Sequence, residues 1–112
     1  PLTKIPAYSA AKAAVKNFTE FMAVHFADVG IRVNAIAPGF FSTNQNKALL
    51  WNEDGTPTAR TNKILGATPM KRFGEANELS GALLFLCDEA YSSFITGTSI
   101  CVDGGFSAYS GV

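Results

Sequence analysis

Apolar residues recur at spacings of three and four between residues 7 and 29, and this pattern predicts one long helix. The apolar stripe consists of Ala14, Phe18, Phe21, Met22, His25 and Val29. Polar residues occupy only a narrow strip of the same stretch, and Gly30 stands where helices commonly end. A helix with so wide an apolar surface needs to be covered on more than one side.

The rest of the chain contains two strand patterns and one further helix pattern. Residues 31–39 alternate and end in Pro38-Gly39, which predicts a short, largely buried strand. Residues 40–70 are polar and rich in turn residues, and we expect a short helix in each part of this functional or mobile connection. A helix is predicted over 76–88 and a last strand over 98–103.

The order helix, strand, long loop, helix, strand predicts a parallel sheet, because strands joined by crossover helices run in the same direction. Two strands do not make a domain, and parallel sheets are covered on both faces. We therefore expect the remaining strands in upstream sequence or in another chain. The first residue is Pro1 rather than methionine, which supports the expectation that these residues are the later part of a longer polypeptide.

Composition narrows the class of protein. Of the 112 residues, 47% are hydrophobic and 16% are charged, so the chain can build a core and has few charges to leave in solvent. Nine basic and nine acidic residues cancel, which argues against binding to nucleic acid or to a membrane surface through net charge. Cys87 and Cys101 show no metal-type spacing and are expected to be small, reduced core residues, so we expect a cytoplasmic location and no metal site.

Tyr8 and Lys12 are the first candidate for chemistry. Their four-residue spacing puts them on one helical face, where a cation beside a phenol can make it a useful acid or base near neutral pH. By itself the pair is a weak signal, because an aromatic residue stacked on a lysine stem looks the same. Pro38-Gly39 strengthens the functional interpretation, since ligands bind at the carboxyl ends of parallel strands. Thr43 follows this strand end closely.

Four segments, in this order and at these separations, resemble the C-terminal half of a short-chain dehydrogenase/reductase. They read Tyr8-x-x-x-Lys12, GIRVNAIAPGFFST, TPMKRFGEANEL and SSFITGTSICVDGG. The resemblance covers essentially the whole chain. It implies an α/β fold in which residues 1–112 form the C-terminal part of a single Rossmann-type, doubly wound parallel sheet domain, incomplete without upstream sequence. It also implies a nicotinamide cofactor, NAD or NADP.

The resemblance also implies roles for individual residues. Tyr8 would be the catalytic acid/base, and Lys12 would hold the ribose hydroxyls of the cofactor and favour the ionised phenol. The cofactor-binding residues would be Tyr8, Lys12, Pro38, Gly39, Phe41 and Thr43. In this family a glycine-rich loop and an active-site serine precede the tyrosine, and neither is in the printed sequence. We therefore expect the 112-residue chain to be inactive by itself.

Within the family, the resemblance is strongest to members that reduce a sugar acid. A carboxylate substrate needs cationic or amide groups for recognition. Residues 44–70 are therefore expected to form a substrate loop, whose candidate ligands are Asn44, Gln45, Asn46, Lys47, Arg60 and Lys63. The alternative for each is a solvated loop residue.

Other functions and partners stay open. A different sugar acid or a polyol is one alternative substrate, and a non-catalytic module that binds through its apolar faces is the alternative from another class. The resemblance implies a homo-oligomer, a tetramer, that uses the long helix and the last helix and strand. The expected partners are thus a small sugar acid, the protein's own N-terminal half and further copies of the chain, with neither nucleic acid nor membrane.

Three further residues are interpreted as structural. We expect Arg72 to form an ion pair, Asp103 to order the turn after the last strand, and His25 to pack near the end of its helix. Trp51 either packs or serves as part of a lid.

Overall fold

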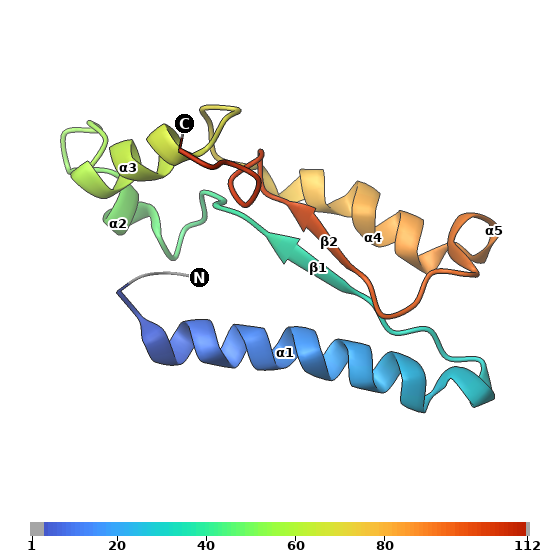
Figure 1. Ribbon diagram of the computed structural model, residues 1–112. Coiled ribbons are helices and arrows are strands. Elements are labelled where there is room, and N and C mark those ends of the chain that lie inside the picture. Colours follow the sequence, from blue (N-terminus) through green and yellow to red (C-terminus); the bar gives the residue numbers. More distant parts are fainter. Residues whose placement is uncertain (1–3, 112) are drawn as a thin grey trace. The chain divides into compact units, whose positions relative to one another are not determined.

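The computed structural model describes residues 4–111, which divide into two compact units. Within the described residues, the first unit comprises 4–36 and 83–100, and the second comprises 37–82 and 101–111. Figure 1 follows the elements along the chain.

The first unit begins with the long helix α1 (Pro6–His25). Proline at the first helical turn and six alanines favour helix, because proline presets the backbone angle and alanine has the highest propensity. The predicted helix over 7–29 is correct except at its end. At Phe26 the backbone leaves the α conformation, and a separate 3₁₀ helix η1 (Ala27–Val29) follows. Gly30 ends η1 in the left-handed conformation, with φ of 76°.

The two strands, β1 (Ala35–Pro38) and β2 (Ser99–Val102), form a two-stranded sheet in the described residues. The amide of Ala35 donates to the Thr98 carbonyl, and the amide of Gly39 donates to the Val102 carbonyl, each at 2.9 Å. Both bonds join residues at the same separation along the chain, so the strands are parallel, as the arrows in Figure 1 show. The predicted α/β class and parallel pairing are confirmed.

The predicted strand over 31–39 was too long and too buried. Val33 donates its amide to the Thr96 hydroxyl, and Asn34 uses its side chain to bond the Ile95 carbonyl and the Thr98 amide. Together with a bond from the Gly97 amide to the Val33 carbonyl at 2.8 Å, these side-chain bonds replace regular strand pairing before Ala35. Within β1 three residues are half-buried and Pro38 is exposed, because the described residues place only one strand beside it.

The helix predicted over 76–88 forms as a 3₁₀ turn, η2 (Ala76–Leu79), that continues into α4 (Ser80–Cys87). A capping box at Glu75 and Glu78 begins it. A short helix α5 (Glu89–Ser92), which the sequence did not predict, follows where the Asp88 carboxylate accepts from the Ala90 amide. Arg32, also in the first unit, donates hydrogen bonds to the carbonyls of Leu86 and Ile95. It thereby links the end of α4 to the turn that follows α5.

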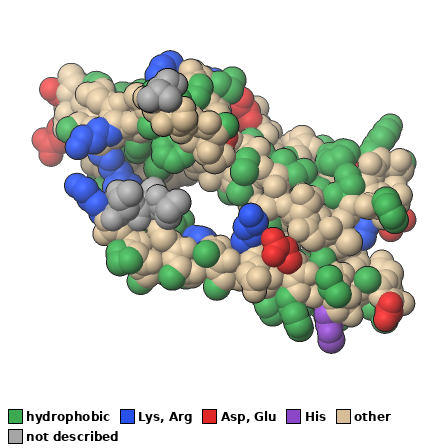
Figure 2. Space-filling model, viewed as in Figure 1, with side chains coloured by type: hydrophobic (Ala, Val, Ile, Leu, Met, Phe, Trp, Pro, Cys, Tyr) green, Lys and Arg blue, Asp and Glu red, His purple; other side chains and the backbone are tan. Residues whose placement is uncertain are grey.

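Much of the apolar surface of α1 is exposed, including Phe18, Phe21 and Val24. Figure 2 shows hydrophobic side chains along this helix on the face in view. The expectation that Cys87 and Cys101 are core residues is wrong, because both are exposed. No helix within residues 4–111 combines the length and apolarity that crossing a membrane requires.

The second unit holds the connection after β1. It contains α2 (Lys47–Leu50) and α3 (Ala59–Ala67), so each part of the connection has the short helix expected from the sequence. Its buried residues are Leu50, Thr61, Ile64 and Thr68. This segment therefore has a small core of its own.

Candidate active site

Tyr8 and Lys12 lie in the first turns of α1, as the four-residue spacing predicts. The Nζ atom of Lys12 lies 5.5 Å from the centre of the Tyr8 ring, which is within cation–π distance. Tyr8 is 51% exposed and Lys12 is also exposed. The prediction that the pair shares one helical face is confirmed, and both polar groups are open to a ligand.

Gly39 stands where β1 ends and comes very close to the end of β2. A Cβ atom at this position would lie 2.6 Å from the Cα atom of Asp103, closer than real Cβ contacts. Gly39 also donates its amide to the Val102 carbonyl at 2.9 Å. Glycine is therefore required here by the close approach of two backbones. Pro38, directly before it, is exposed.

The segment from Phe41 to Thr43 is held by Asn46, a role that the sequence did not reveal. The Thr43 amide donates to Oδ1 of Asn46 at 2.9 Å, and Nδ2 of Asn46 donates to the Phe41 carbonyl at 2.8 Å. Asparagine commonly bonds to nearby backbone in this way, so its place three residues after Thr43 was a possible signal. The Thr43 side chain is exposed.

The predicted substrate loop is a folded segment. The Thr61 hydroxyl donates to the Leu50 carbonyl, and the Thr58 amide donates to the same oxygen at 3.0 Å, so α2 and α3 are joined through one carbonyl. Trp51 packs edge-on against Phe73, with ring centres 6.3 Å apart. The candidate substrate ligands that lie exposed on this segment are Asn44, Gln45, Lys47, Arg60 and Lys63.

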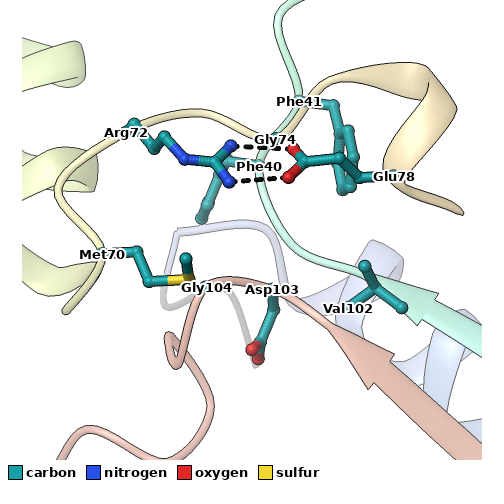
Figure 3. Close-up of a pocket in the computed structure, with 9 residues that line it drawn as sticks. All are labelled: Phe40, Phe41, Met70, Arg72, Gly74, Glu78, Val102, Asp103 and Gly104. Atoms are coloured by element: carbon teal, nitrogen blue, oxygen red, sulfur yellow. Dashed lines mark hydrogen bonds and ion pairs between the residues drawn. The ribbon is translucent and has the colours of Figure 1, made fainter.

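A cavity of about 110 Å³ lies in the second unit, and Figure 3 shows its lining. Arg72 donates two hydrogen bonds to the Glu78 carboxylate, at 2.6 and 2.7 Å. The hydrogen bonds from Arg72 and one from the Glu75 amide lower the pKa of Glu78 from 4.5 to about 2. Because the guanidinium is committed to Glu78, Arg72 is a structural ion-pair partner, as expected.

Two other structural interpretations are confirmed. The Asp103 carboxylate accepts from the amides of Gly105 and Ser107, at 2.9 and 2.8 Å, and so orders the turn after β2. The side-chain hydrogen bond with Ser107 is the largest cause that lowers the pKa of Asp103, and the bonds from the backbone amides lower it further. His25 packs near the end of α1 between the rings of Phe21 and Phe26, at 5.6 and 4.8 Å.

The candidate residues are distributed over both units. Tyr8 and Lys12 belong to the first unit, and the second holds Pro38, Gly39, Phe41, Thr43, Asn44, Gln45, Lys47 and Arg60. In residues 4–111 there is no group of three or more His, Cys, Asp or Glu residues that could hold a metal ion. The donors at hand are a phenol, an ammonium, a threonine hydroxyl and backbone groups, which suit hydroxyl and amide groups of an organic ligand.

Several known proteins are similar to this chain over all or nearly all of its length. An uncharacterized oxidoreductase of Bacillus subtilis (strain 168), UxuB, is 65% identical over all 112 residues. A crystal structure with bound NAD, of a Haemophilus influenza protein provisionally named D-mannonate oxidoreductase, is 68% identical and superposes with a TM-score of 0.94 over the whole chain. An Agrobacterium tumefaciens protein with bound NADP, provisionally named 2-deoxy-D-gluconate 3-dehydrogenase, is 38% identical over 94% of the chain, with a TM-score of 0.81.

The chain spans 40% of the length of each of these three relatives. Residues 2–107 also match the family described as enoyl-(acyl carrier protein) reductase, which is a family of short-chain dehydrogenases/reductases. The match covers nearly all of the chain, and with it the Tyr8–Lys12 pair, the end of β1 and the turn after β2. The chain belongs to the short-chain dehydrogenase/reductase family.

Proposed function

We propose that the protein to which this chain belongs is an NAD(P)-dependent oxidoreductase with Tyr8 as its acid/base. The observation that carries the proposal is the exposed Tyr8–Lys12 pair, with Nζ of Lys12 5.5 Å from the Tyr8 ring. Membership of the family supports it, and so do the NAD and NADP bound by two relatives. The reduced nucleotide that supports turnover, NADH or NADPH, identifies which of the two cofactors this protein uses.

Each unit of the chain offers groups whose chemistry suits the nicotinamide riboside part of such a cofactor. Lys12 offers an exposed ammonium for ribose hydroxyls, and Thr43 offers an exposed hydroxyl beside the end of β1 for the carboxamide. Pro38, Gly39 and the Phe41 backbone are the other proposed contacts. When bound, the cofactor supplies a hydride to the carbonyl carbon of the substrate.

Tyr8 then completes the reduction. Its phenol donates a proton to the carbonyl oxygen as the carbon accepts the hydride, so that a ketone becomes a secondary alcohol. Lys12, as a neighbouring cation, stabilises the phenolate that remains. In the reverse direction the phenolate takes the proton of the alcohol.

For the substrate we propose D-fructuronate, reduced to D-mannonate. The name of the Haemophilus influenza relative supports this choice. Residues 44–70 are the proposed substrate loop, and its exposed groups Asn44, Gln45, Lys47 and Arg60 would bind the substrate carboxylate. A gluconate-type dehydrogenase, such as gluconate 5-dehydrogenase, is the second candidate, and the name of the Agrobacterium tumefaciens relative favours it.

A non-catalytic role is the third candidate, and the exposed apolar side chains of α1 favour it. A tetramer, association with the protein's own N-terminal half and a cytoplasmic location remain predictions of the family resemblance. Turnover assays separate these candidates.

The experiment uses protein expressed from its complete gene. Loss of NADH or NADPH absorbance is measured with D-fructuronate, and nucleotide reduction is measured with gluconate. Tyr8→Phe should lower kcat by about 10²–10⁴-fold, the usual contribution of a general acid. Tyr91→Phe, at another exposed tyrosine, is the matched control and should leave kcat unchanged.

The outcomes distinguish the candidates. Full activity of Tyr8→Phe refutes its role, and activity with gluconate alone supports the second substrate. Wild-type protein that binds no nucleotide and turns over neither substrate supports the non-catalytic role.

A separate set of variants tests the substrate loop. Lys47→Met and Arg60→Met should raise the KM for the substrate, whereas Lys16→Met on α1 should not.

A further inference from the structure

We infer that Asn46 is a positioning residue, which fixes the backbone of residues 41–43 for binding of the nicotinamide end of the cofactor. The inference rests on the proposed function, which assigns this segment to the cofactor. One side-chain amide bonds on both sides of Ser42, because it accepts from the Thr43 amide at 2.9 Å and donates to the Phe41 carbonyl at 2.8 Å. Each bond fixes a different peptide group.

The backbone of Asn46 adds a third bond, since its amide donates to the Thr43 carbonyl at 3.2 Å. Asn46 stands at the N-cap of α2, where an asparagine side chain usually accepts from an amide of the helix. Here no such cap bond forms, and the side chain reaches back to residues 41–43 instead. The Asn46 side chain thus bonds the backbone of the segment after β1 and not the backbone of α2.

The start of the segment is fixed by Gly74. The ring of Phe41 lies against this glycine so closely that a Cβ atom there would lie 2.5 Å from Cε1 of the ring. The Gly74 amide donates to the Phe40 carbonyl at 2.9 Å. Residues 40–43 are therefore held by Gly74 at the start and by Asn46 at the end, which is how a binding segment is preorganised.

These hydrogen bonds distinguish Asn46 from the other polar residues of the loop. Its oxygen and its nitrogen both have backbone partners and it is half-buried, whereas Asn44, Gln45 and Lys47 are exposed. Asn46 is thus less available to a substrate than its neighbours. The Thr43 amide is also occupied, so Thr43 offers its hydroxyl to a ligand.

The chemistry demands both a donor and an acceptor at this position. Asn46→Asp keeps an acceptor for the Thr43 amide but sets a carboxylate oxygen against the Phe41 carbonyl. Asn46→Ala removes both bonds. Asn77→Ala is the matched control, because Asn77 is an exposed asparagine in the same unit of the chain.

The first test measures dissociation constants on protein from the complete gene, with the reduced nucleotide that the wild type binds and with ADP-ribose, which lacks the nicotinamide. Asn46→Ala and Asn46→Asp should each raise the dissociation constant of NADH or NADPH by about tenfold, which corresponds to the loss of one or two net hydrogen bonds. Binding of ADP-ribose should not change. Asn77→Ala should leave both constants unchanged.

Other outcomes overturn the inference. If the dissociation constants of the nucleotide and of ADP-ribose rise by the same factor and the thermal midpoint falls, Asn46 only supports the fold. Unchanged binding of both means that the segment needs no such support. Wild-type protein that binds no nucleotide refutes the proposed function, and the inference with it.

A second test is independent of any ligand. Hydrogen exchange at the Thr43 amide should be slower in the wild type than in Asn46→Ala, because the amide loses its acceptor in the variant. Equal exchange rates would show that the side chain does not hold this backbone, whatever the nucleotide does.

Discussion

Replacement of Gly39 by alanine should destabilise the protein by steric overlap alone. Gly39 has no positive φ, so alanine fits its backbone conformation. The new Cβ atom, however, would lie 2.6 Å from both Cα and Cβ of Asp103 and 3.1 Å from its carbonyl oxygen, against an optimum of about 3.5–4.0 Å between carbons. Two of these three atoms belong to the backbone of Asp103, directly after β2, so a side-chain rotation cannot relieve the overlap.

Overpacking of this kind costs about 1–3 kcal/mol. Separation of the strands would also stretch the bond from the Gly39 amide to the Val102 carbonyl, which contributes about 0.5–1.5 kcal/mol. In a domain of about 150–250 residues each kcal/mol lowers the thermal midpoint by about 2–4 °C. We therefore expect the midpoint of Gly39→Ala to fall by at least about 2 °C.

The assay is thermal unfolding followed by circular dichroism, without added nucleotide, so that ligand binding does not contribute. Gly66→Ala is the matched control. Gly66 lies in α3 with no atom within 4 Å of its added Cβ, so alanine should be neutral or stabilise by up to about 1 kcal/mol. A midpoint of Gly39→Ala at or above that of the wild type would refute the close-approach argument.

Two further predictions concern the second unit. Thr61→Val should lower the free energy of unfolding by about 1 kcal/mol in urea titrations, because the hydrogen bond from the Thr61 hydroxyl to the Leu50 carbonyl is lost. Thr61→Ser keeps this hydroxyl, so the contribution of the hydrogen bond to stability should be retained in that variant. A valine variant as stable as the wild type would contradict the role of the hydroxyl. For Glu78, whose folded pKa of about 2 lies below its ordinary 4.5, the stabilising effect is present above about pH 4.5 and is lost as pH falls towards 2. The stability difference between wild type and Glu78→Gln should therefore shrink across that window, and a difference that stays constant down to pH 2 would contradict the Arg72 ion pair.

Much of the fold follows from local sequence patterns. The spacing of apolar residues identified α1 and α4, and the four-residue spacing of Tyr8 and Lys12 placed both on one face. Such patterns work because helix periodicity is a property of the backbone itself. The Pro38-Gly39 pair likewise marked the end of β1, since proline ends regular pairing.

What could not be predicted depends on contacts between separate segments. Thr61 is polar, yet it is fully buried because the Leu50 carbonyl, eleven residues earlier, accepts its hydroxyl. Asn46 looked like any polar loop residue, because its role depends on the path of the chain after β1. The true start of β1 was also hidden, since Asn34 and Thr96 provide side-chain bonds in place of regular pairing.

The small core of the segment between β1 and η2 has a consequence for how specificity can change. Leu50, Thr61, Ile64 and Thr68 hold the segment from inside, whereas Asn44, Gln45, Lys47, Arg60 and Lys63 lie exposed on it. Surface substitutions away from such a core usually change stability by less than about 0.5 kcal/mol. These five positions can therefore be randomised together in a library while the scaffold that carries them stays folded. Under the substrate role proposed for the loop, new ligand preferences can be selected from such a library without loss of the fold.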